Sequence, residues 1–249
     1  MELITSLRPD MFSVAYNPGQ SVKLNPVFAS FYIQNKIKIP AIFTLSTQDM
    51  NKRSLEGLLL GAQILGLNNV MFVMGDTLAT KSLTTTRVIE LTKNMNQGFD
   101  FNNNKLEYPT EFCIGATLDI SKNWDNESLL TQKKIHAGAD FLLAQAQFDI
   151  SKVERFLDHY HKLIGTYIDL PILWGVQMLM NGSKSFTNIP NSIKQDLLKG
   201  KSSVDITLNI IEQYNSYGIH SFYLLPPFFK NGQRDYSLAQ KVIYSLTSH

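Results

Sequence analysis

Seven short apolar runs, separated by amphipathic segments, are the feature that most constrains the fold of this chain. The strands predicted from these runs are 12–16, 40–45, 70–74, 112–117, 141–145, 172–175 and 221–224. Strands that alternate with helices are typical of a parallel sheet built from βα units. The chain has 249 residues, and one eight-stranded barrel typically takes about 250. We therefore predict an α/β protein with a (β/α)8 TIM-type barrel, incomplete with seven recognisable strands, as a single domain over residues 1–249.

Glycine stops and a capping pattern mark the helices between these strands. Leu55 and Leu59 belong to an apolar face with helical spacing. Ser151 followed by Glu154 has the pattern of a capping box at the start of a helix. Four helices are predicted to end at a glycine, the residue that most readily adopts the left-handed C-cap conformation: Gly66, Gly138, Gly200 and Gly218.

Composition excludes several classes of function. Hydrophobic residues make up 44% of the chain and the formal net charge is +2, so neither nucleic acid nor an anionic membrane is an expected partner. No apolar run reaches the roughly 20 residues that span a bilayer, and residues 1–8 do not resemble a signal peptide. The single cysteine, Cys113, lies in an apolar run, where we expect a small core residue. A reduced, cytoplasmic location is the expectation.

Polar side chains follow two of the predicted strands. The segment 137–149 is predicted to contain a helix end, a buried strand and then the glutamines Gln145 and Gln147. Asp76 follows the strand 70–74 in the same way. In a parallel barrel the carboxyl ends of the strands form the ligand-binding face, so we expect a polar ligand there.

Two segments fit no regular element. Residues 98–104 are rich in asparagine, and residues 180–191 are rich in serine, asparagine and glycine. Either segment could be a ligand-binding loop of a barrel enzyme or a solvated surface loop. No dinucleotide-binding or phosphate-binding glycine motif is present. His159 and His161 are two residues apart on a predicted helix, so we expect surface residues and no metal site.

The order of these motifs resembles the methylenetetrahydrofolate reductase family. The resemblance covers residues 6 to 236 and rests on Gly75-Asp76, Phe112–Ala116, Lys133–Phe141, Gln145 with Phe148-Asp149, and Pro171–Val176. It implies a barrel that holds FAD at the carboxyl ends of its strands. The implied reaction is the flavin-dependent reduction of 5,10-methylenetetrahydrofolate, or a related methylene-tetrahydropterin, to the 5-methyl form with NAD(P)H. Such an enzyme would serve one-carbon metabolism and methionine biosynthesis.

The resemblance also implies roles for individual residues. Asp76 would be catalytic and lie beside the flavin, where a carboxylate stabilises the cationic iminium form of the folate. Gln145 would bind the pterin ring, since an amide offers a donor and an acceptor side by side. Phe186 would pack on the folate. The residues implied for the FAD site, besides Asp76, are Thr44, Ser46, Glu127, Lys133 and Lys134.

The sequence also departs from the family's pattern. The glutamate that serves as general acid at the end of the family's first strand has no counterpart after Met1. A threonine of the family falls on Ala15, a flavin-side histidine on Thr44, and an arginine on Met74. Loss of a general acid typically costs about 10²–10⁴-fold and does not abolish activity.

Three interpretations therefore stay open. The chain is a divergent reductase with another proton source, one subunit of a complex whose partner completes the site, or a non-redox tetrahydropterin-binding methyl-transfer component. A barrel with an unrelated small substrate is a further alternative, because fold does not fix function. A barrel that lacks one strand leaves an open edge, so we expect a homo-oligomer or a subunit of a complex. Phe228 and Phe229 could belong to such an interface or line the mouth of the site.

Overall fold

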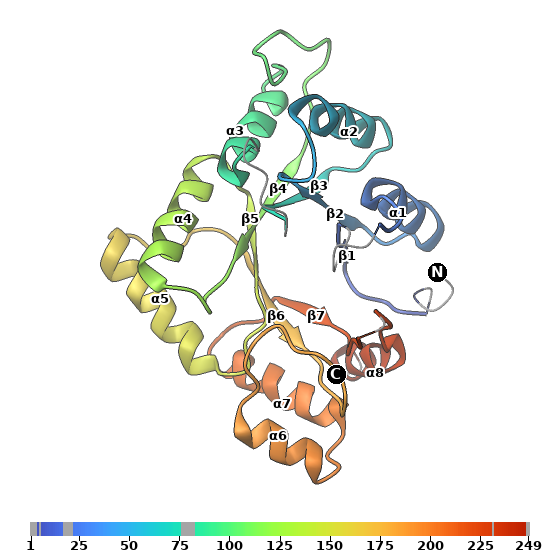
Figure 1. The fold of residues 1–249 in the computed structure, drawn as a ribbon, viewed down its shortest axis with the longest axis vertical. Coiled ribbons are helices and arrows are strands. Elements are labelled where there is room, and N and C mark those ends of the chain that lie inside the picture. Colours follow the sequence, from blue (N-terminus) through green and yellow to red (C-terminus); the bar gives the residue numbers. More distant parts are fainter. Residues whose placement is uncertain (1–3, 5, 17–21, 76–82, 231, 248–249) are drawn as a thin grey trace. The chain divides into compact units, whose positions relative to one another are not determined.

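The computed structural model describes residues 4, 6–16, 22–75, 83–230 and 232–247. Figure 1 shows how strands and helices alternate along the chain. The strands are β1 (Phe12–Val14), β2 (Ala41–Ser46), β3 (Asn69–Val73), β4 (Cys113–Leu118), β5 (Phe141–Ala144), β6 (Ile172–Gln177) and β7 (Phe222–Leu225). The helices are α1 (Pro26–Tyr32), α2 (Lys52–Ile64), α3 (Thr85–Asn96), α4 (Trp124–His136), α5 (Ile150–Ile164), α6 (Asn191–Leu198), α7 (Ser203–Ser216) and α8 (Tyr236–Thr247), with a π-helical turn (Ile33–Ile37) after α1.

The strand order confirms the predicted fold class. Seven strands follow one another as β1-β2-β3-β4-β5-β6-β7, which is the order in the chain. Adjacent strands are parallel in the pairs β1–β2, β2–β3, β3–β4 and β6–β7. All seven predicted strands lie within two residues of the observed ones. This is the topology of a (β/α)8 barrel with seven of its eight strands.

The described residues cluster into two compact units. The N-terminal unit comprises residues 10–117 and 129–142, and the C-terminal unit comprises residues 1–9, 118–128 and 143–249. The division cuts through β4, α4 and β5. A single domain over the whole chain stays a prediction.

The core of the N-terminal unit surrounds β2, which is buried along its whole length. Phe43 and Phe72 on neighbouring strands are fully buried, and Leu55 and Leu59 bring the apolar face of α2 onto the sheet. Gly66 follows the C-cap of α2, and its φ of 70° is the left-handed conformation predicted for a glycine stop. The same prediction is confirmed at Gly138, Gly200 and Gly218, with φ of 102°, 81° and 74°.

The prediction that Cys113 is a core residue is wrong. Cys113 is the first residue of β4 and its thiol is exposed. Its amide donates to the carbonyl of Asn68 over 2.8 Å, so the main chain is paired while the side chain lies at the amino edge of the sheet. An apolar run does not reveal where along it the burial begins.

The asparagine-rich segment 98–104 is a structured surface loop. It follows α3 and precedes β4, so it lies at the amino end of the strands, where barrels do not place ligand loops. Asp100 accepts hydrogen bonds from the main-chain amides of Asn102 and Asn104, over 2.8 and 2.7 Å. A hydrogen bond from the Asn104 side chain, followed by those from the two main-chain amides, lowers the pKa of Asp100. The ligand-loop interpretation of this segment is therefore wrong.

Candidate functional site

The segment that follows β5 carries the two glutamines predicted from sequence. Gln145 is partly exposed, and its amide donates to the carbonyl of Leu118 at the end of β4 over 2.8 Å. Gln147 is only 5% exposed, and its amide donates to the carbonyl of Gly175 on β6 over 3.3 Å. Hydrogen bonds to two different strands fix the main chain here. The Gln147 side-chain nitrogen is buried and has no hydrogen-bond partner within the described part of the chain.

Gly175 lets this segment approach β6 closely. A Cβ on Gly175 would lie 2.6 Å from the carbonyl oxygen of Ala144 and from the amide nitrogen of Ala146. Those atoms belong to the main chain and cannot rotate away as a side chain can. The position of Gln145 therefore depends on residue 175 being a glycine, which has no side chain.

Tyr214 on α7 contacts the same segment. Its hydroxyl donates to the Gln147 carbonyl over 3.3 Å. Burial, with a smaller contribution from the charge of Asp149, raises the pKa of Tyr214 far above its ordinary value, so the hydroxyl stays protonated and can donate. Asp149 is itself the N-cap of α5 and accepts from the amide of Ser151 over 3.0 Å. The predicted capping box at Ser151 is therefore wrong, because an aspartate two residues earlier takes the cap.

Gln177, the last residue of β6, holds the loop that follows it. Its side-chain nitrogen donates to the carbonyl of Lys184 over 2.7 Å, and its oxygen accepts from the amide of Phe186 over 3.1 Å. Phe186 stays 48% exposed and stacks on Phe228, with ring centroids 4.6 Å apart. The guanidinium of Arg234 lies 5.5 Å from the Phe228 ring centroid. This loop lies at the carboxyl end of β6, as a ligand loop of a barrel would.

The N-terminal unit has its own polar strand end. Thr44, two residues before the end of β2, and Thr47, directly after that end, are buried, and their hydroxyls have no hydrogen-bond partner among the residues that the structure describes. The Ser46 hydroxyl donates to the carbonyl of Met74 over 3.2 Å. Gly75 has a φ of 94°, and a Cβ there would collide with the Ser46 hydroxyl. Asp76 lies outside the described residues.

Of the three charged residues predicted on α4, Glu127 and Lys134 form hydrogen bonds with the protein itself. Glu127 is buried and accepts from the amide of Asp119 over 3.0 Å. Lys134 is 3% exposed, and its ammonium donates to the carbonyl of Thr117 over 2.6 Å. Lys133 is exposed. The two lysines thus differ in environment.

These contacts indicate which of the predicted residues could bind FAD. An unpartnered buried hydroxyl at Thr44 suits a group that forms hydrogen bonds at the end of β2. A diphosphate needs accessible cations, however, and the Lys134 ammonium is buried against a main-chain carbonyl. In this structure Lys134 therefore does not fit the diphosphate of FAD, whereas the exposed Lys133 stays a predicted contact.

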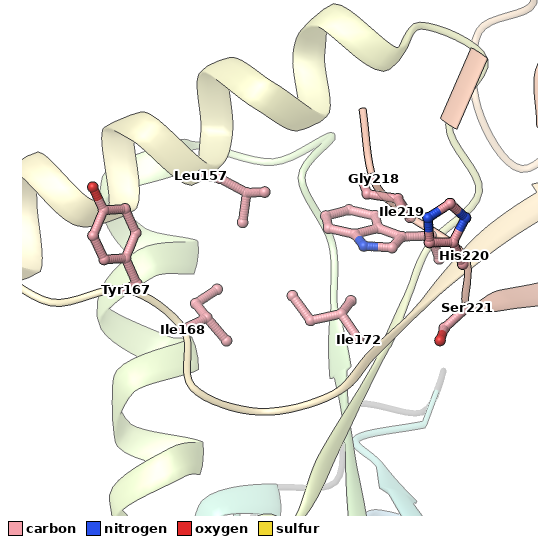
Figure 2. Close-up of a pocket in the computed structure, with 9 residues that line it drawn as sticks. Leu157, Tyr167, Ile168, Ile172, Gly218, Ile219, His220 and Ser221 are labelled. Carbon is pink, nitrogen blue, oxygen red and sulfur yellow. The ribbon is translucent and has the colours of Figure 1, made fainter. Parts of the chain in front are cut away.

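A separate pocket lies at the opposite end of the strands in the C-terminal unit. Figure 2 shows Leu157, Ile168, Ile172 and His220 around it. Its volume is about 310 Å³. Because Ile172 begins β6, the pocket opens at the amino end of that strand, away from Gln177. It is distinct from the carboxyl-end positions predicted for a ligand.

The described residues define a protein of the parallel (β/α)-barrel class with polar and aromatic side chains after its strands. The family model for methylenetetrahydrofolate reductase matches residues 1–221. The chain belongs to the methylenetetrahydrofolate reductase family.

Solved structures agree on the fold. One is an uncharacterized protein from Clostridium thermocellum that binds two copies of 5-methyl-5,6,7,8-tetrahydrofolic acid; it is 18% identical, with a TM-score of 0.67 over 98% of this chain and 86% of that one. Another is EDTA monooxygenase (EmoA) from Chelativorans sp. BNC1, 10% identical, with a TM-score of 0.58 over 99% of this chain and 84% of that one. No curated protein matches the sequence significantly.

Two negative findings apply to the part of the chain that the structure describes. No helix there is long and apolar enough to cross a membrane. Over the same residues, no group of three or more His, Cys, Asp and Glu side chains could hold a metal ion. His159 instead pairs with Asp125 over 2.7 Å, and His161 stacks on Tyr167 with ring centroids 3.9 Å apart.

Sequence reasoning missed the roles of Gly175 and Gln177. A glycine inside a predicted strand is a known signal of close backbone approach, and it was available in the sequence. A glutamine that ends a strand carries no signal that its amide will hold the next loop. That assignment required the coordinates.

Proposed function

We propose that this chain binds a reduced folate at the carboxyl end of β5 and reduces its 5,10-methylene group to a 5-methyl group. The observation that carries the proposal is the pair of amides after β5, one partly exposed and one buried with an unpartnered nitrogen. A pterin ring offers alternating donors and acceptors that amides can match. Membership of the reductase family supports the reaction, and the folate-binding Clostridium thermocellum structure supports the ligand.

Individual residues take the roles that the family resemblance implies. Gln145 forms hydrogen bonds to the pterin ring, and its main chain is fixed by the bond to Leu118. Phe186 offers a half-exposed ring, already stacked on Phe228, against which the rest of the folate can pack. Asp76 supplies the carboxylate that stabilises the positive charge of the iminium form.

FAD with NAD(P)H is the proposed source of the hydride, on family membership alone. The flavin would lie near Thr44 and Ser46 at the end of β2. Glu127, Lys133 and Lys134 would complete the FAD site only if the Lys134 ammonium left the Thr117 carbonyl.

A second function is favoured by that same contact at Lys134. A non-redox folate-binding methyl-transfer component, or a partner subunit of a reductase complex, needs no diphosphate site. The apolar residue Met74 and the small residue Ala15, where the family has arginine and threonine, agree with this alternative. It predicts folate binding without flavin retention.

The deciding experiment combines visible absorbance with calorimetry. A purified protein that shows flavin absorbance, bleached by NADH or NADPH and restored by methylenetetrahydrofolate, supports the reductase. A colourless protein that takes up no added FAD but binds 5-methyltetrahydrofolate supports the non-redox alternative. Gln145→Ala should weaken folate binding about 10–100-fold, since it removes both halves of an amide contact. Gln213→Ala, at an exposed position on α7, is the matched control and should bind as the wild type does.

We further propose that the chain acts in the cytoplasm as a homo-oligomer or as a subunit of a complex. Phe228 bears on the proposed oligomer, since it is a candidate interface residue and already packs against Phe186 within the same unit. Light scattering of the purified protein decides the oligomeric state. A monomer at micromolar concentration would contradict the homo-oligomer.

A further inference from the structure

The side chain of Gln147 carries a hydrogen-bonding requirement that the described protein does not meet. The residue is 5% exposed, and the nitrogen of its amide is buried without a partner. Leaving a buried donor unpaired is costly, and such groups are rare in native structures. Its oxygen is not among the buried unpartnered atoms. What the site needs is therefore an acceptor.

The main chain of Gln147 leaves little freedom to relieve this. Its amide donates to the carbonyl of Gly175, and its carbonyl accepts from the hydroxyl of Tyr214, each over 3.3 Å. Tyr214 is fully buried. Two neighbouring elements thus hold the residue in place.

The location of Gln147 indicates what the missing acceptor is. Gln147 lies two residues after Gln145 and two before the helix cap Asp149, in the segment that joins the carboxyl end of β5 to α5. Ligands of parallel α/β proteins bind at this edge of the sheet. The only other common partner for a buried amide is an ordered water.

We propose that Gln147 is a second pterin-binding residue, whose side-chain N–H donates to a carbonyl oxygen or ring nitrogen of the bound reduced pterin. This inference rests on the proposed folate binding and adds a specificity-determining residue to it. The unpaired donor destabilises the free protein, and a bound ligand that accepts this hydrogen bond removes the destabilisation. Gln147 thereby favours ligands that present an acceptor to this position.

Gln147→Met tests the proposal, since methionine keeps the length of the side chain and removes the donor. The expected result has two parts. The melting temperature of the ligand-free protein rises by about 2–4 °C, because an unpaired buried donor is gone. The dissociation constant for 5-methyltetrahydrofolate, measured by calorimetry, rises about 5–10-fold, because one hydrogen bond to the ligand is lost.

Gln177→Met is the matched control. Gln177 is buried like Gln147, yet both ends of its amide are bonded, to Lys184 and Phe186. The same substitution there should lower the melting temperature. The opposite signs of the two changes in melting temperature distinguish an unpaired buried amide from a paired one.

Several outcomes overturn the inference or the function beneath it. A melting temperature that does not rise in Gln147→Met shows that a water or a protein group satisfies the amide. An unchanged dissociation constant shows that the ligand does not use it. If the wild type itself binds no 5-methyltetrahydrofolate, the proposed function fails. If the wild type binds and Gln147→Met binds equally well, only the role of Gln147 fails.

Discussion

Gly175→Ala tests whether the close approach of β6 positions Gln145. The new Cβ would lie 2.6 Å from the Ala144 oxygen and the Ala146 nitrogen, whereas ordinary contact begins at 3.4 Å. Strand β6 and the segment after β5 must therefore separate by about 0.8 Å, the difference between these two distances. The atoms involved are main-chain atoms, so no side-chain rotation can absorb the change.

The cost has two parts. Overpacking in a close-packed region costs about 1–3 kcal/mol. The same displacement would break the 3.3 Å bond from the Gln147 amide to the Gly175 carbonyl, which costs about 1 kcal/mol more. A total of about 2–4 kcal/mol corresponds to a fall in melting temperature of about 4–16 °C for a chain of this size.

Binding should suffer as well, since an ångström of misplacement can cost up to about 100-fold in a well-positioned site. The assay is thermal unfolding followed by circular dichroism, with folate calorimetry on the protein that remains folded. Gly57→Ala is the control: Gly57 is exposed in the middle of α2, and nothing lies within 4 Å of its added Cβ. Alanine there should stabilise by about 0.5–1 kcal/mol. A Gly175→Ala protein that melts and binds like the wild type would refute the reasoning.

Two further predictions concern α4 and β4. Lys134→Met should lower the stability of the free protein by about 1–3 kcal/mol, because it removes the charged 2.6 Å hydrogen bond to the Thr117 carbonyl, whereas Lys133→Met at an exposed position should not. A loss of FAD affinity with no fall in melting temperature would instead place Lys134 on the cofactor. Partial desolvation of the thiol and the nearby charge of Asp140 raise the pKa of Cys113 above its ordinary value, so alkylation by iodoacetamide should reach half its maximal rate at a higher pH than for free cysteine. An inflection at or below that of free cysteine would contradict the second prediction.

The order of elements could be predicted because it depends on short-range pattern. Continuous apolar runs of strand length, broken by glycine and by helical spacing, place all seven strands within two residues. The capping residue of α5 could not be predicted, because two nearby residues can both cap a helix. Asp149 and Ser151 are both suitable, and the structure shows that Asp149 is the cap. The burial of Lys134 was equally hidden, because the apolar stem of a lysine suits either face of a helix.

Parts of the candidate site were within reach of the sequence. Gln145 and Gln147 follow a predicted buried strand, and that position alone indicates a polar ligand. The main chain of Gln147 is held by Gly175 and Tyr214, which are distant in sequence. No local pattern could supply those contacts.

The way in which Gln177 fastens the loop after β6 has a consequence for engineering. A turn closed by the 3.0 Å bond from the Ser183 amide to the Met180 carbonyl places Asn181 and Gly182 at an exposed tip. The bonds to Gln177 fall beyond that turn, at Lys184 and Phe186. A change at the tip should therefore not move the aromatic ring of Phe186. A fluorophore or a short peptide inserted between Asn181 and Gly182 would report on the loop while leaving Phe186 in place.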